Sequence, residues 1–149
     1  MKTILAILAL SLCTVVSAQT APKEKPMVIY DWKINRVVDG DTVEVATPWV
    51  PDPLAKKMSI RVFGVDTPEK GHRAMCPSEA QRGEAASAFT KKVITESKTA
   101  RVAVLSWDKY GGRMLGDIIL DNNTSLRALL IKNGFAREYY GEAKQSWCN

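Results

Sequence analysis

The order of apolar runs is the feature of this 149-residue chain that most limits its fold. Five short runs are rich in β-branched and aromatic residues, as strands are, and turn-forming residues separate them. They are Met27–Val38, Thr42–Ala46, Met58–Val65, Ala100–Ser106 and Met114–Leu120. A long helical stretch separates the third run from the fourth, and a short one follows the fifth. This order predicts an α+β, mainly β fold: a five-stranded barrel of the oligonucleotide-binding (OB) type with two or three helices.

Local signals place the boundaries of these elements. Asp39-Gly40 is a hairpin turn signal between the first two strands. Ser78 with Gln81 three residues later is a capping box, which predicts a helix from about Glu79 to Ser97. The second helix carries leucines on one face and ends before Gly134, the residue type that most often follows a helix C-terminus.

Residues 1–18 have the pattern of a secretory signal peptide, with a basic start, a short apolar core and small residues before the cut. The apolar core is too short to span a bilayer comfortably. We therefore expect one domain over residues 19–149, with 19–26 as a flexible leader. The expected location is secreted or periplasmic, without stable membrane association.

The numbers of cysteines and histidines limit the metal sites and catalytic mechanisms that are possible. Removal of residues 1–18 leaves two cysteines, Cys76 and Cys148, and an even count in an exported chain predicts a disulfide. Zinc needs about four ligands, which two cysteines and the single His72 do not supply. One histidine also excludes a two-histidine ribonuclease. The formal net charge of +5 favours a polyanionic partner, although this signal alone is weak.

Two acidic segments follow strand-like runs, one around Asp41 and one from Asp66 to Glu69. Asp41 and Asp66 are candidate ligands of a hard cation such as calcium or magnesium, which prefers carboxylate and carbonyl oxygens. The alternative for each segment alone is a turn, where aspartate and glycine are favoured for local reasons. Two such segments at the ends of two strands favour the metal site.

Glu69 is the candidate general base that activates water for attack on phosphorus. Arg61 and Arg113 are candidate phosphate ligands, because the planar guanidinium matches two phosphate oxygens. The alternatives are a solvated loop carboxylate, a solvated strand face and a cation at a hairpin end. Strict alternation would put Arg61 and Asp66 on opposite faces of one strand, so we expect irregular pairing around residues 63–66, where Gly64 lies.

Aromatic side chains offer stacking surfaces for bases near these groups. Tyr110, Tyr139 and Tyr140 are the candidates, with Lys109 as a nearby phosphate contact. The more common alternative for each tyrosine is a surface or rim aromatic. Three tryptophans are expected to pack in the core or at its rim: Trp49, Trp107 and Trp147.

From about Val37 to Tyr140 the chain resembles the staphylococcal-type thermonuclease family, that is, micrococcal nuclease and its homologues. The resemblance rests on several segments in the same order and spacing. They are Val38-Asp39-Gly40-Asp41-Thr42, Arg61 through Glu69, Ala86 through Lys92, Asp108-Lys109-Tyr110-Gly111 followed by Arg113, and Leu129 through Ala136.

The resemblance implies calcium-dependent hydrolysis of DNA and RNA with little sequence preference, leaving 3′-phosphate ends. It assigns calcium to Asp41, Asp66 and the Thr67 carbonyl. Arg61 and Arg113 would bind the phosphate, and Glu69 would act as base. Nucleotide contacts would come from Lys109, Tyr110 and one of the two C-terminal tyrosines, more readily Tyr140. Single-stranded or frayed substrates and a monomer are expected.

Three departures from the family pattern stand out. Gly112 is an extra residue before Arg113, the loop from Lys70 to Ser78 is longer, and a third helix is not expected after Tyr140. A Cys76–Cys148 bridge would anchor the tail instead. Two other functions stay open, a non-catalytic OB-fold module that binds nucleic acid and a secreted structural or inhibitor domain.

Overall fold

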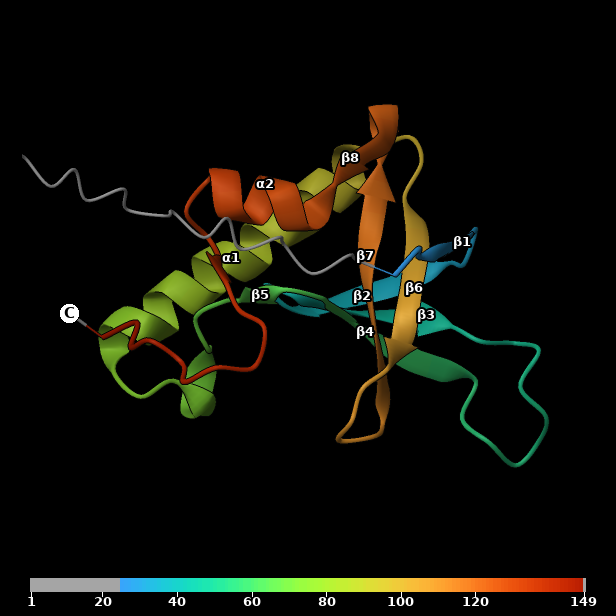
Figure 1. Ribbon diagram of the computed structural model, residues 1–149, viewed down its shortest axis with the longest axis horizontal. Helices are drawn as coiled ribbons and strands as arrows, with labels where there is room; N and C mark the ends of the chain where they lie inside the picture. Colours follow the sequence, from blue (N-terminus) through green and yellow to red (C-terminus); the bar gives the residue numbers. More distant parts are fainter. Residues whose placement is uncertain (1–24, 149) are drawn as a thin grey trace, which may run out of the picture.

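The computed structural model describes residues 25–148, which form a curved sheet with one long helix across it (Figure 1). The expected signal peptide and residues 19–24 of the leader lie outside this range. The strands are β1 (Val28–Tyr30), β2 (Ile34–Asp39), β3 (Thr42–Ala46), β4 (Lys57–Val62), β5 (Val65–Asp66), β6 (Arg101–Trp107), β7 (Arg113–Leu120), β8 (Thr124–Ser125) and β9 (Arg137–Glu138). The helices are α1 (Pro77–Glu96), α2 (Leu126–Lys132) and two 3-10 turns, η1 (Gly71–Arg73) and η2 (Asp121–Asn123). Within residues 25–148, none of the helices has the length and apolar character needed to cross a membrane.

The main sheet has the order β1-β6-β7-β4-β3-β2, with β8 added on β7. The strands β4 and β7 run parallel, and the other pairs in this sheet are antiparallel. The two ends of this path, β1 and β2, are separated by only residues 31–33. Four residue steps span at most about 14 Å, so the sheet curls until its edges approach. The mainly β, OB-type fold expected from the sequence is therefore confirmed.

The predicted first strand is interrupted, because its two halves pair with different partners. Val28–Tyr30 pairs with β6, and Ile34–Asp39 pairs with β3. The prediction of irregular pairing around residues 63–66 is confirmed. The strand β4 ends at Val62, Gly64 has a positive φ of +76°, and β5 pairs with β9 instead of with a neighbour in the main sheet.

The predicted capping box at the start of α1 is wrong. Cys76 is the N-cap, and its sulfur accepts a hydrogen bond from the Glu79 amide at 3.4 Å. Pro77 occupies the first turn, where its missing amide hydrogen costs nothing. Glu79 instead points its carboxylate backwards and accepts hydrogen bonds from the amides of Met75 and Glu69. The start of α1 is thus tied to the loop that precedes it.

The core lies between the concave face of the sheet and the two helices. Its largest fully buried side chains come from β3, β4, β6, β7 and α2: Val43, Val45, Ile60, Val62, Val102, Ile118, Leu126 and Leu130, with Val65 from β5. This core fixes the strand ends from which the acidic segments project.

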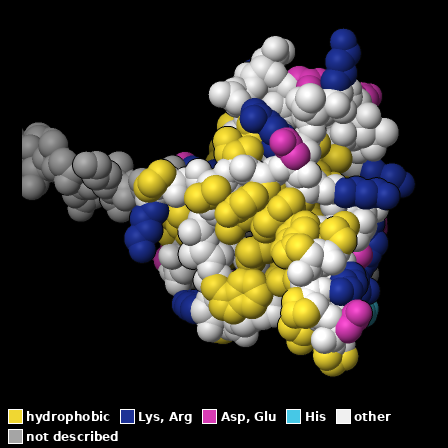
Figure 2. Space-filling view, turned by 90° about the vertical axis from the view of Figure 1, so that its right-hand side faces the viewer, with side chains coloured by type: hydrophobic (Ala, Val, Ile, Leu, Met, Phe, Trp, Pro, Cys, Tyr) yellow, Lys and Arg dark blue, Asp and Glu magenta, His cyan; other side chains and the backbone are white. Residues whose placement is uncertain are grey.

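One outer face is strongly hydrophobic (Figure 2). Tyr30 stacks on Trp32 with ring centroids 4.5 Å apart, and Trp32 lies 4.8 Å from Trp49. Trp49 and Trp107 are exposed, so they are surface aromatics and not core residues, whereas Trp147 is buried.

Candidate active site

Both acidic segments pack against the helix α1. The Thr90 hydroxyl donates a 2.7 Å hydrogen bond to the carbonyl of Gly40, in the turn before Asp41. Nearer the start of α1, Gly83 packs against the second segment so closely that an added Cβ would lie 2.3 Å from the Glu69 carbonyl oxygen. Such a contact requires backbone movement, so glycine is needed there. Segments more than 20 residues apart in the chain are thereby brought to one place.

Asp41 and Asp66 converge on Arg61. Arg61 Nη2 lies 3.1 Å from Asp41 Oδ2 and 3.8 Å from Asp66 Oδ1. The two aspartates are 2% and 5% exposed, so their charges are almost completely removed from water. The break in pairing at Gly64 is what allows Asp66 to reach the side of the sheet that Arg61 occupies.

The donor chemistry of this pair fits a hard cation. Burial raises the pKa of the Asp41 carboxyl to about 6, although the Arg61 guanidinium acts in the opposite direction. Both carboxyl groups offer oxygen donors only. Such a donor set fits a hard cation such as calcium or magnesium. Thr67, whose carbonyl is the predicted third ligand, is buried directly after β5.

Glu69 lies beside this pair and is partly exposed. Its carboxylate is 3.3 Å from Arg73 Nε and 3.9 Å from Lys144 Nζ. Its backbone amide donates to Glu79, a contact that sequence reasoning missed. Glu79 could have been found from its position three residues after the true N-cap, had Cys76 been considered as a cap.

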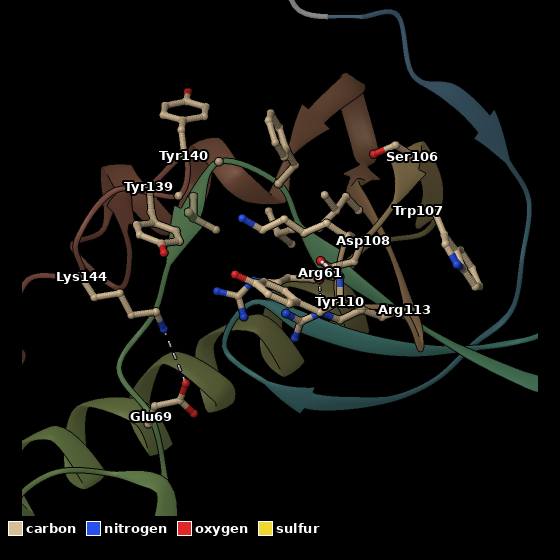
Figure 3. A pocket seen from close by; sticks show the side chains of 17 residues that line it. Arg61, Glu69, Ser106, Trp107, Asp108, Tyr110, Arg113, Tyr139, Tyr140 and Lys144 are labelled. Carbon is tan, nitrogen blue, oxygen red and sulfur yellow. Dashed lines mark hydrogen bonds and ion pairs between the residues drawn. The ribbon is translucent and has the colours of Figure 1, made fainter.

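A cavity of about 640 Å³ contains Arg61, Glu69 and Arg113 in its wall (Figure 3). The two arginines share a face because β4 and β7 run parallel with Ser59 opposite Arg113. Arg61 is two residues beyond Ser59, and residues two apart on a strand point to the same side. Within residues 25–148, Asp41 and Asp66 do not line the cavity, and they lie behind Arg61.

Gly112 does not carry Arg113 away from the site. Gly111 and Gly112 both adopt positive φ, at +74° and +72°, so the turn accommodates the extra residue before β7 starts. Arg113 Nε is 2.5 Å from Asp108 Oδ2. Burial alone would raise the pKa of Asp108, but hydrogen bonds from Arg113 and the Tyr110 amide outweigh it and the pKa is lowered. Asp108 therefore stays charged and orients the guanidinium.

The candidate nucleotide contacts also line the cavity. Tyr110 is 79% exposed, and Lys109 Nζ lies 4.9 Å from the centre of its ring. Tyr139 and Tyr140 both line the wall, but Figure 3 shows Tyr139 turned towards Lys144 and Tyr140 turned outwards. Tyr140 contacts Phe63 and Arg127. Tyr139 is the one beside Lys144, whose Nζ lies 5.8 Å from the centre of its ring.

The C-terminal segment reaches the acidic site, and the sequence did not reveal this. Cys76 and Cys148 are joined by a disulfide, with Cα atoms 6.0 Å apart. Lys144 Nζ lies 2.7 Å from Asp66 Oδ1, and the Trp147 indole donates to Asp66 Oδ2 at 3.1 Å. The available signal was the predicted disulfide, because Cys76 lies only seven residues after Glu69 and its partner must bring the tail with it.

Comparison with known protein families finds a match over the region that contains most of the candidate site residues. The profile of the family described as "Staphylococcal nuclease homologue" matches residues 59–147, which is more than half of the chain. The match begins within β4 and extends through the tail.

Two curated relatives are similar over most of this chain. "Endonuclease YhcR" of Bacillus subtilis (strain 168) is 31% identical over 116 residues, which cover 74% of this chain and 9% of that protein. "Thermonuclease" of Staphylococcus hyicus is 35% identical over 112 residues, covering 71% of this chain and 57% of that protein. The chain thus matches less than two thirds of either relative.

Proposed function

Because the chain belongs to the staphylococcal nuclease homologue family, we propose that it is a calcium-dependent nuclease that hydrolyses phosphodiester bonds in DNA and RNA. The observation that carries the proposal is the cavity in which two arginines and a carboxylate meet. Arg61 is held by Asp41 and Arg113 by Asp108, and both guanidinium groups line the cavity, where their planar forks can bind phosphate oxygens.

The side chains divide the reaction between them. Arg61 and Arg113 bind the phosphate and stabilise the charge that builds on its oxygens as water attacks. Glu69 takes one proton from that water, the new oxygen–phosphorus bond forms, and the bond from phosphorus to the 5′-oxygen breaks. The leaving oxygen acquires a proton from solvent, and the product keeps a 3′-phosphate. When bound at Asp41, Asp66 and the Thr67 carbonyl, Ca²⁺ would supply positive charge next to the phosphate.

Substrate form and location are further parts of the proposal. The cavity is bordered by tyrosines that can stack on unpaired bases, which supports single-stranded or frayed substrates. We also propose that the protein acts as a monomer outside the cytoplasm. The disulfide between Cys76 and Cys148 supports an oxidising compartment.

The test is cleavage of a 5′-labelled single-stranded DNA and an RNA of the same length, with calcium or with chelator. The protein, Arg113→Ala and Arg82→Ala are compared, the last as a control because Arg82 is exposed on α1. Calcium-dependent cleavage that Arg113→Ala lowers about a hundredfold or more supports the proposal. Binding of both substrates without cleavage would identify a non-catalytic binding module instead.

A further inference from the structure

The tail residues Lys144 and Trp147 contact both oxygens of one carboxylate. Lys144 Nζ lies on Asp66 Oδ1 at 2.7 Å, and Trp147 Nε1 donates to Asp66 Oδ2 at 3.1 Å. Lys144 also approaches Glu69, at 3.9 Å. A positive charge from the chain itself therefore sits between the candidate ligand and the candidate base (Figure 3 shows its contact with Glu69).

The tail is held in this position by contacts that do not involve the acidic groups. The Arg137 guanidinium lies 3.7 Å from the centre of the Trp147 ring, and it donates to the Ser146 carbonyl at 2.9 Å. Arg137 is itself the strand partner of Asp66 in the β5–β9 pair. The disulfide of Cys148 closes the arrangement one residue later. Through Arg137, Trp147 is therefore held against the same pair of strands, β5 and β9, that carries Asp66.

Lys144 and Trp147 differ in how easily they can leave. Trp147 is 6% exposed and its indole is packed under Arg137, so its hydrogen bond is part of the fold. The side chain of Lys144 is 48% exposed and ends in a compact charge on a flexible stem. An ammonium and a divalent cation cannot both occupy Asp66 Oδ1, so binding of the ion requires the lysine to move.

We propose that Lys144 is a built-in competitor for the divalent cation at Asp66, and that Trp147 positions the same carboxylate for that ion. The inference rests on the proposed function for the identity of the ion. It assigns opposite effects to two residues three positions apart in the chain. Loss of Lys144 strengthens cation binding, and loss of the Trp147 donor weakens it.

The experiment is calorimetric titration of calcium into the disulfide-intact protein and its variants, without nucleic acid. Lys144→Gln is expected to bind calcium about tenfold more tightly, and Trp147→Phe about tenfold more weakly. Lys144→Arg keeps the positive charge and should stay close to the original protein. Lys70→Gln removes the same charge one residue after Glu69, and it measures the general electrostatic effect.

The outcomes separate the inference from the proposed function. The competitor role is overturned if Lys144→Gln binds calcium with the same affinity as the original protein or as Lys70→Gln. It is also overturned if none of the variants binds calcium. Trp147→Phe with unchanged affinity overturns the positioning role. Cleavage is scored separately, so a protein that binds calcium with the expected order but cleaves nothing would refute only the nuclease.

Discussion

The candidate site has two walls that are held in different ways. Asp41 lies in the turn directly before β3, and Arg61 projects from β4; the neighbouring residues Val43, Ile60 and Val62 are among the most buried of the core. The opposite wall is Lys144 and Trp147, on a segment without regular structure that ends at a disulfide. Packing of the core determines the first wall, whereas the disulfide and the contacts of Arg137 with Trp147 and Ser146 hold the second.

This difference teaches that charge alone does not define the role of a residue in the site. Arg61 and Lys144 are both cations in contact with Asp66. Arg61 is held by β4 and shared with Asp41, so we expect it to keep its position when substrate and ion bind. Lys144 is half-exposed, so it can be replaced. Arg61 is therefore expected to serve the reaction, and Lys144 to control access to it.

The largest expected effect is on the cleavage rate, and it comes from a substitution in the wall that the core holds in place. Arg61→Ala should lower the cleavage rate about a thousandfold, because it removes a phosphate ligand and breaks the ion pair with the buried Asp41 carboxylate. Trp147→Phe should lower the rate about tenfold at the same calcium concentration. Rates are measured on single-stranded DNA, with Arg82→Ala as control. Equal losses in Arg61→Ala and Trp147→Phe would contradict the distinction between the walls.

The second prediction concerns the link that holds the tail. The disulfide joins residues separated by 72 positions, and a loop of this length corresponds to a stabilisation of about 4 kcal/mol. The double variant Cys76→Ser and Cys148→Ser should lose a free energy of unfolding of that order, measured by urea titration. The original protein in reducing agent should behave in the same way. Unchanged stability, or free thiols in the untreated protein, would contradict the bridge.

The third prediction concerns the contact between α1 and the second acidic segment. Gly83→Ala places a methyl group against the backbone of Glu69 and Pro68, which should lower the free energy of unfolding by about 2 kcal/mol. Ala85→Val, at an exposed position of α1, is the matched control. If the two variants are equally stable, α1 does not press on this segment as described.

The smallest effect is expected far from both walls, at Asp121. Its carboxylate accepts hydrogen bonds from the amides of Lys98 and Thr99 and from the Thr99 hydroxyl, which lowers its pKa to about 2. The lowered pKa contributes stability above about pH 4 that is lost as pH falls through about 2. Asp121→Asn should therefore be less stable at neutral pH, by a difference that shrinks in this acidic range.

This difference is measured by thermal unfolding between pH 7 and pH 2. Glu96→Gln serves as a control, because Glu96 is an exposed carboxylate at the end of α1. A difference between Asp121→Asn and the original protein that is independent of pH would contradict the assignment. Cleavage should be unaffected by either substitution.

The sequence was sufficient for elements whose local signals agree with their surroundings. Thr42–Ala46 was predicted with its observed limits, and the position of Gly64 correctly predicted the break before Asp66. The first run looked continuous because apolar and aromatic residues recur along its whole length, from Val28 to Val38. Its interruption after Tyr30 follows from the two partners that the curled sheet offers, and local sequence does not contain that information.

The site shows the same limit. Asp41, Arg61 and Glu69 could be singled out because carboxylates and guanidinium groups near strand ends suggest a chemistry. Lys144 and Trp147 carry no such signal, since a lysine and a tryptophan in a polar tail are common. Their role depends on where the disulfide places them, and that is visible only in three dimensions.

The most direct test of the central claim is single-turnover cleavage by Glu69→Gln at saturating calcium. The substitution keeps the shape of the side chain and removes the base. We expect nucleic acid binding to persist, while the cleavage rate falls at least a hundredfold. The control Glu84→Gln, exposed on α1, should cleave normally and leave 3′-phosphate ends. Cleavage by Glu69→Gln at the original rate would contradict the account of this site.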